Sequence, residues 1–308
     1  MFQEKALLTF YAETPVHMGA GQSVSYVDLP IQRERITGFP TLWASGIKGV
    51  IRDLATRVWN DENKVEAIFG PKKSAEEFAS CISITDAKIL LYPIRSVRGV
   101  FAWITCPFVL KRFKEDLESI NISFKLNETE ILISEPQNDN EAIVSPNSIL
   151  ELSENIISLE EFVFNIQKSS EIDTLGKFIK NLLPQNELIN SLTQRLVIVK
   201  DDIFKDFVNY AVEIRTRIKI EQSKGTVESG NLFTEEFIPS ESMFYSLIFM
   251  TNPYTTYDEI NSAERVKETL NSLLNNKLLQ LGGDETIGMG FMRVKFYYTE
   301  GVKNDENN

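Results

Sequence analysis

Short segments in which apolar residues alternate with polar ones, or follow one another without interruption, predict the strands of this chain. These segments are Lys5–Glu13, Ile82–Tyr92, Gly99–Cys106, Val212–Glu221, Ser242–Met250 and Phe291–Tyr298. The link between the second and the third segment is too short for a crossover helix, which predicts an antiparallel pair. In the fourth segment Ile214 and Ile218 share one face, and the other face is cationic through Arg215, Arg217 and Lys219.

Apolar residues three or four positions apart predict helices over Gly46–Trp59, Phe108–Leu117 and Tyr257–Leu274. Residues 149–180 show the same spacing, broken by polar residues, and the polar stretch before them predicts a loop or an irregular insert. The core elements thus follow as strand, helix, strand, strand and, after a long insertion and an extra strand, helix and strand. This order predicts an α+β fold with a split βαβ, ferredoxin-like core, the fold of RNA-recognition modules.

One domain is expected over residues 1–308, because 43% hydrophobic residues suffice for a sizeable core. We expect a partly helical insertion at about residues 107–200. The strand Val212–Glu221 is followed by a segment that contains Gly225 and Gly230. This segment predicts a long, projecting hairpin at about residues 205–240.

Cysteine and histidine are scarce, which limits the possible chemistry. Two cysteines provide no disulfide framework, so a reducing intracellular setting is the simpler inference. A single histidine makes a tetrahedral zinc site unexpected, and any bound metal would have oxygen ligands. The chain has no run of about 18 apolar residues and no signal-peptide pattern at its start. We therefore expect a cytoplasmic protein without a membrane partner.

The net charge of −12 argues at first sight against a nucleic-acid partner, because such proteins usually carry a basic surface. The charge is unevenly distributed. Between Glu115 and Glu161 there are 12 acidic residues and one basic residue, so the rest of the chain sums to only −1. A peripheral acidic insertion would leave basic surface elsewhere free to contact phosphate.

Residues 14–53 concentrate the candidate chemistry. They contain the only histidine, a two-glycine loop, an acid between apolar neighbours, two arginines and the start of a helix, namely His17, Gly19, Gly21, Asp28, Arg33, Arg35, Ser45, Gly46 and Lys48. Ser45 as N-cap, with the nearby lysine, predicts a phosphate site because helix N-termini favour anions. Each residue also has an ordinary explanation, as a packed histidine, a turn glycine or a solvated lysine. Their grouping in a loop favours a functional site.

Three ordered motifs carry a resemblance to a known family. They are TPVHMGAG with DLPIQRERITGFP and SGIKGVIRD near the start, NLFTEEFIPSESMFYSLI at residues 231–248, and LGGDETIGMGFMRV at residues 281–294. Together they resemble the RAMP proteins of CRISPR effector complexes, and within these the backbone subunit of the type III-B (Cmr) complex. Residues of about 110–200 add little to the resemblance. RAMP proteins have a modified ferredoxin-like (RRM-type) fold, and the hairpin would correspond to their thumb.

The resemblance implies a repeating, RNA-guided endoribonuclease subunit. Its expected partners are crRNA, single-stranded target RNA, other copies of itself in a filament and other Cmr subunits. It implies metal-dependent cleavage to a 2′,3′-cyclic phosphate, with Asp28 as the catalytic aspartate that acts as a base or holds Mg²⁺ or another divalent cation. His17, Glu235 and Glu236 occupy family positions near the cut, and Phe237 stands where relatives often have tyrosine.

We expect the RNA to be held by cationic side chains and by backbone at close-approach glycines. The residues concerned are Arg33, Arg35, Ser45, Gly46, Lys48, Arg52, Arg215, Arg217, Lys219, Gly282, Gly283, Gly288 and Gly290.

Two alternatives stay open at the level of the sequence. A subunit of the same architecture could bind crRNA without cutting. A small-molecule enzyme could instead use the glycine-rich turn for a phosphate-bearing ligand, although Met289 stands where the lysine of a P-loop would be.

Overall fold

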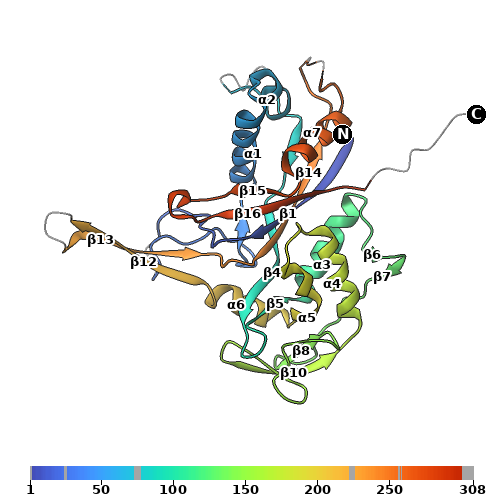
Figure 1. Cartoon of the computed structure of the whole chain (residues 1–308), viewed down its shortest axis with the longest axis vertical. Coiled ribbons are helices and arrows are strands. Elements are labelled where there is room, and N and C mark those ends of the chain that lie inside the picture. The colour runs from blue at the N-terminus through green and yellow to red at the C-terminus, as the bar shows by residue number, and fades with distance from the viewer. Residues whose placement is uncertain are drawn as a thin grey trace, which may run out of the picture.

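The computed structural model describes residues 2–23, 26–72, 78–221, 226–255, 257 and 259–299, with side chains described outside residues 219–231. The fold is mixed α+β, built on one 12-stranded sheet that runs through the molecule (Figure 1). Buried residues from the N-terminal, middle and C-terminal parts of the chain form one hydrophobic cluster. Among the described helices, none combines the length and apolar character needed to cross a bilayer.

The first part of the chain contains five strands and three helices within the described residues. Its elements are β1 (Glu4–Ala12), β2 (Thr41–Leu42), α1 (Ala44–Trp59), α2 (Glu62–Phe69), β3 (Ile82–Ile84), β4 (Ala87–Arg95), β5 (Phe101–Thr105) and α3 (Pro107–Ser119). The predicted first strand and the predicted antiparallel pair are confirmed, with β4 running on through Pro93 before it turns into β5.

Shorter elements make up the middle of the chain. They are β6 (Lys125–Leu126), β7 (Thr129–Glu130), β8 (Glu141–Val144), β9 (Ile156–Leu159), β10 (Phe162–Lys168), α4 (Glu171–Leu182), η1 (Leu188–Ser191), α5 (Leu192–Arg195), β11 (Leu196–Ile198) and α6 (Asp201–Tyr210). The last part comprises β12 (Glu213–Glu221), β13 (Thr226–Phe237), β14 (Met243–Met250), α7 (Ala263–Leu274), β15 (Lys277–Gln280), η2 (Glu285–Ile287) and β16 (Phe291–Tyr297).

The centre of the sheet has the order β16-β1-β14-β4. Strand β14 pairs antiparallel with β1 from Met243 to Met250, and β1 pairs antiparallel with β16 on its other side. The predicted order of core elements includes the segment of β5, whereas in the structure β14 lies between β1 and β4, and β5 lies beyond β4. The near-continuous apolar sequence of β14 accounts for its position, because a central strand is covered on both faces.

The acidic segment lies at one end of the main sheet and is built into it. Strands β5-β11-β8-β10-β9 continue the main sheet, so the segment extends the same hydrophobic core. The predicted helical character of residues 149–180 is wrong over β9 and β10 and correct only for α4. In β9 and β10 every second residue is buried, namely Ile157, Leu159, Phe164 and Ile166. Period-two burial is that of a half-buried strand.

Strands β12 and β13 form a separate two-stranded hairpin that projects from the body of the molecule (Figure 1). The predicted strand at residues 212–221 is confirmed, whereas part of the predicted turn, residues 222–225, lies outside the described residues. The sequence pattern left open which face of this strand is buried. Ile214 and Ile218 are 46% and 51% exposed, while Arg215 and Arg217 are half-buried against the body of the protein.

Glu241, in the turn before β14, is a carboxylate in an unfavourable environment. Its backbone has a φ of 71°, and its main-chain oxygen accepts a hydrogen bond from Trp103 Nε1 at 2.8 Å. Its side-chain Oε2 is buried and has no hydrogen-bond partner among the described residues. Burial raises the pKa of Glu241 to about 7.

This raised pKa predicts a loss of stability with rising pH. The folded chain binds the Glu241 proton more tightly than the unfolded chain, so the stabilisation is complete below pH 4.5 and is lost as the pH rises through about 7. The loss is of the order of 3 kcal/mol at most. Glu241→Gln, which stays neutral, should flatten the dependence of the urea-unfolding free energy between pH 5 and 8. Exposed Glu154→Gln serves as the control and should leave the slope unchanged.

Candidate functional site

The loop that carries Asp28 lies alongside β13, about 200 residues later in the chain. Leu29 forms a parallel bridge with Glu235. The Leu29 amide donates to the Thr234 carbonyl at 3.0 Å, and the Glu236 amide donates to the Leu29 carbonyl at 3.0 Å. Pro30 follows with its φ fixed by the ring. The loop is therefore held as a short strand against the base of the hairpin.

The Asp28 side chain is exposed and hydrogen-bonded on one side only. Its Oδ2 accepts from the Thr234 amide at 2.8 Å and from the Thr234 hydroxyl at 2.9 Å. These two bonds, the backbone bond more than the hydroxyl bond, lower the pKa of Asp28 below its ordinary value. The site thus presents an ionised carboxylate to solvent. The sequence motif containing Thr234 drew attention only to its acids, so this threonine was missed.

Glu236 is a buried partner of the same loop. Its carboxylate pairs with the Arg33 guanidinium at 2.5 Å and accepts from the Ile31 amide at 3.0 Å. Arg33 also donates to the carbonyls of Gly38 and Val208 and to the Asn209 side chain. Arg33 therefore acts as an internal clamp between the loop, the hairpin and the end of α6, and not as the phosphate contact that we predicted.

His17 is buried beneath these residues. Its Nδ1 lies 2.7 Å from the Glu236 carbonyl oxygen, and because a carbonyl can only accept, Nδ1 carries the hydrogen. Its ring packs on Phe237 with centroids 5.5 Å apart. A Cβ at Gly19 would stand only 2.9 Å from His17 Nε2, which is why glycine is required there. The imidazole is thus a packed support of the loop.

Glu235, the first acid of the Glu235–Glu236 pair, connects the hairpin to the glycine-rich turn. Arg217 Nε donates to the Glu235 carboxylate at 2.7 Å, and Arg217 Nη2 lies 3.3 Å from the Asp284 carboxylate. Arg215 pairs with Glu213, and both arginines stack over the ring of Phe237. The cations of β12 therefore serve the protein itself in this structure. The Lys219 side chain lies outside the described residues.

The glycine-rich turn approaches His17, so the close approach expected of its glycines is made within the chain. A Cβ at Gly282, whose φ is +88°, would lie 2.2 Å from the His17 carbonyl oxygen. The Gly283 amide donates to that oxygen at 2.9 Å. Gly290 makes an equally close approach to the Leu281 carbonyl, whereas Gly288 faces open space. Of these glycines, Gly288 keeps the clearest opening for a ligand.

The start of α1 differs from the predicted phosphate site. Trp43 is the N-cap and Ser45 lies within the first turn, so the predicted capping role of Ser45 is wrong. A Cβ at Gly46 would meet Met18 at 2.9 Å, so this glycine accommodates the His17 loop. Lys48 Nζ donates to Ser80 Oγ at 2.8 Å and to the Ile82 carbonyl at 3.1 Å, and burial lowers the pKa of Lys48.

The cations expected to contact RNA thus divide into two groups. The Arg52 guanidinium donates to the Gly70 carbonyl at 2.9 Å and, like Lys48, holds the chain together. Arg35 is exposed and has no ion pair among the described residues. Its neighbour Ile36 is 93% exposed, so both side chains project from the loop that follows Asp28. Arg35 is the predicted cation that the structure leaves most accessible.

Comparisons with known proteins establish the family. A sequence profile described as "RAMP superfamily" matches residues 9–293, nearly the whole chain. The chain belongs to the RAMP superfamily. This RAMP protein is 42% identical over 292 residues to a Pyrococcus furiosus protein named CRISPR system Cmr endoribonuclease Cmr4, covering 94% of each chain.

Solved structures agree with this membership. The RAMP protein matches the crystal structure of oligomeric Cmr4 from Pyrococcus furiosus with a TM-score of 0.73 and 34% identity, covering 96% of this chain and 99% of that one. It also matches a chain in the cryo-EM structure of type III-B Cmr-beta in the apo state, with a TM-score of 0.72 and 25% identity over 98% and 99% of the two chains.

The RAMP protein does not present a preformed metal cage. Among the described residues, no group of three or more His, Cys, Asp or Glu side chains could hold a metal ion. Glu235 and Glu236 are each only 6% exposed and are paired with arginines. Of these three acids, only Asp28 has an exposed carboxylate. A divalent cation therefore fits this site only if most of its ligands come from water and from phosphate, as Mg²⁺ commonly accepts.

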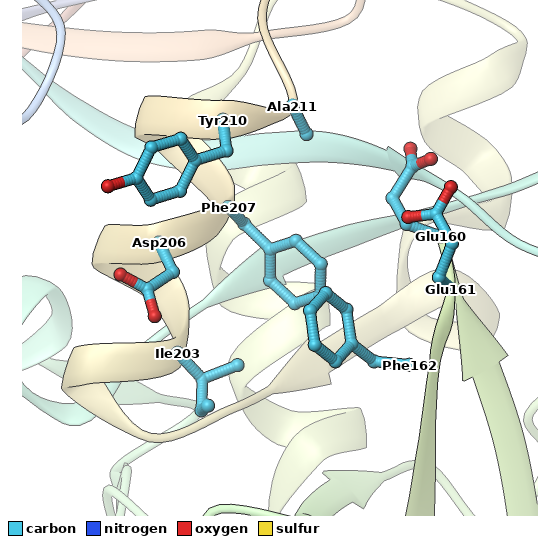
Figure 2. A pocket seen from close by; sticks show the side chains of 8 residues that line it. All are labelled: Glu160, Glu161, Phe162, Ile203, Asp206, Phe207, Tyr210 and Ala211. Atoms are coloured by element: carbon cyan, nitrogen blue, oxygen red, sulfur yellow. The ribbon is translucent and has the colours of Figure 1, made fainter.

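A pocket of about 550 Å³ lies away from Asp28, between α6 and the turn that joins β9 to β10. Phe162 and Phe207 face each other in it, with Ile203 and Tyr210 from the same side of α6 (Figure 2). The charged groups that line it are all acidic, namely Glu160, Glu161 and Asp206. An acidic lining repels phosphate, so this pocket does not support a small-molecule enzyme with a phosphate-bearing ligand.

The packing of the glycine-rich turn yields a stability prediction. Gly282→Ala combines an unfavourable positive φ with a clash against the His17 backbone, and should cost roughly 1–3 kcal/mol in the free energy of unfolding. Gly49→Ala is the matched control, because a Cβ there meets nothing within 4 Å and alanine is the better helix former. Thermal melting should show a lower midpoint for the first variant and an equal or higher midpoint for the second.

Proposed function

We propose that this chain is the repeating backbone subunit of a type III-B RNA-guided complex, in which it binds crRNA and cleaves the paired target RNA. The observation that carries the proposal is the 42% identity, over nearly the full length of both chains, to a relative named a Cmr endoribonuclease. The similarity to an oligomeric relative supports assembly of several copies of this chain.

The central sheet supports an RNA-recognition type of core. Strand order β16-β1-β14-β4, with α1 between β1 and β4 and α7 between β14 and β16, is the order of a split βαβ unit. On this basis we assign the ferredoxin-like core to these elements. The hairpin of β12 and β13 would then be the thumb, and its exposed apolar side chains would contact a neighbouring subunit.

We assign the catalytic role to Asp28 and supporting roles to the other predicted residues. Cleavage joins the RNA 2′-oxygen to the adjacent phosphorus and breaks the bond from phosphorus to the 5′-oxygen. The 2′-hydroxyl loses a proton and the 5′-oxygen gains one. The lowered pKa of Asp28 makes it a weak base at neutral pH but a stable anion. His17, Glu235 and Glu236 are buried or paired and would hold the loop in place.

A divalent cation such as Mg²⁺ is proposed as a cofactor that arrives with the RNA. When bound, it would supply charge stabilisation for the reacting phosphate. Asp28 is the residue of this chain that would contribute a ligand oxygen. Among the predicted RNA-contacting residues that the structure describes, Arg35, Ser45 and the open side of Gly288 would remain available for phosphate.

A second candidate is a subunit of the same architecture that binds guide RNA without cutting. It is favoured by one observation: two of the three acids near the site are committed to arginine pairs. The two candidates make opposite predictions for target RNA once metal is supplied, because only the first releases cleaved products.

Replacing the catalytic carboxylate separates these candidates. In a complex assembled with guide RNA and companion subunits, Asp28→Asn should bind target normally while cleavage falls by at least about 100-fold, since a transition-state interaction is lost without uniform binding. Cleavage is followed on a labelled target with Mg²⁺ present. Asp202→Asn, an exposed acid on α6, is the control and should cut as the wild type does. Full activity of Asp28→Asn would remove Asp28 from the mechanism.

The two arginines that follow Asp28 should behave differently on substitution. Arg35→Ala should weaken RNA binding and reduce the salt slope by about one charge, because it removes an accessible cation. Arg33→Ala should instead lower the melting temperature, because it leaves the buried Glu236 carboxylate unpaired. Binding titrations at several salt concentrations and thermal melts of both variants test this. An unaltered salt slope in Arg35→Ala would contradict the assignment.

A further inference from the structure

Thr234 makes a closed set of contacts with Asp28. The Asp28 amide donates to Thr234 Oγ1 at 3.0 Å, and Oγ1 donates to Asp28 Oδ2 at 2.9 Å. The Thr234 amide donates to the same Oδ2 at 2.8 Å. One hydroxyl can accept and donate at once, so both the backbone and the side chain of Asp28 are held by a single residue. Oδ1 has no partner within the described part of the chain.

We propose that Thr234 is a positioning residue for RNA cleavage, which fixes one oxygen of the Asp28 carboxylate and leaves the other directed to the substrate. The proposal rests on the proposed function, in which Asp28 acts at the cut. It adds a specific requirement for a hydroxyl group at position 234. This position lies on β13, about 200 residues after the Asp28 loop in the sequence.

The surroundings of Thr234 make it a rigid support. Thr216 of β12 lies directly opposite Thr234 in the hairpin. The Thr234 carbonyl accepts a hydrogen bond from the Leu29 amide. The next residue, Glu235, points to the other face and pairs with Arg217. Thr234 is therefore held by a strand on one side and by the catalytic loop on the other. Carboxylates held in this way avoid the loss of rate, about 100-fold for a displacement of about 1 Å, that misplaced catalytic groups show.

The same contacts set the charge of the carboxylate. The pKa of Asp28 is lowered first by the Thr234 backbone bond and then by the Thr234 hydroxyl bond, against a small opposing effect of burial. No charged side chain among the described residues contributes to this shift. Loss of the hydroxyl should therefore loosen the orientation of the carboxylate, because the bond from Thr234 Oγ1 to Asp28 Oδ2 is lost.

The test compares three variants in the assembled complex. Thr234→Val removes the hydroxyl with little change of shape and should lower the cleavage rate about tenfold or more at unchanged target binding. Thr234→Ser keeps the hydroxyl and should restore the rate. Thr216→Val makes the same change on the same face of the neighbouring strand, where no bond to Asp28 exists, and should match the wild type.

A second measurement keeps this proposal separate from the proposed function. The carboxyl carbon of Asp28 is observed by NMR in the isolated chain at neutral pH, where its chemical shift should change in Thr234→Val and return in Thr234→Ser. An unchanged chemical shift overturns the hydrogen-bond assignment, and a changed shift with a wild-type cleavage rate overturns the positioning role. If Asp28→Asn cuts normally, the catalytic assignment of Asp28 fails, whatever the NMR measurement shows about Thr234.

Discussion

The buried ion pair of Glu236 and Arg33 is the interaction on which the candidate site depends. A carboxylate that is 6% exposed must be paired, since breaking such a pair typically costs about 3–5 kcal/mol. Arg33 joins it to the end of α6, the Ile31 amide joins it to the catalytic loop, and its own carbonyl orients His17. Together with the backbone bonds between Leu29 and β13, these contacts hold the loop and so determine the position of Asp28.

The same arrangement shows how the cations near the site are used in this acidic chain. Several cations near the site neutralise internal acids or carbonyls, as Arg33, Arg217 and Lys48 do. They stabilise the geometry of the loops and contribute little free charge to the surface. In the proposed function, electrostatic attraction of RNA would then depend on a few accessible cations, such as Arg35, and on neighbouring subunits. The acidic strands β8–β10 extend the sheet at its far end, away from the Asp28 loop (Figure 1).

The glycine-rich turn shows how a motif can be correctly located and incompletely interpreted. Gly282 and Gly290 are needed because a Cβ at either position would clash with a backbone carbonyl, a close approach that the motif suggested. For Gly282 the approaching backbone is that of His17, 265 positions earlier in the chain. The two motifs at opposite ends of the sequence are therefore parts of one packed unit, and the need for glycine there does not by itself indicate a ligand.

The sequence by itself determined the strands and helices with strong periodicity, among them β1, α1, β12 and α7. In these elements the spacing of apolar residues matches the period of a strand or a helix. It also located Asp28, through a family motif. Tertiary structure decided the rest. The central position of β14, the strands of the acidic segment, and the burial of the arginine face of β12 all depend on which element packs against which. The partners of Arg33, Glu236 and Thr234 lie about 200 residues away. Such pairings depend on how distant segments pack against one another, which the spacing of residues along the chain does not show.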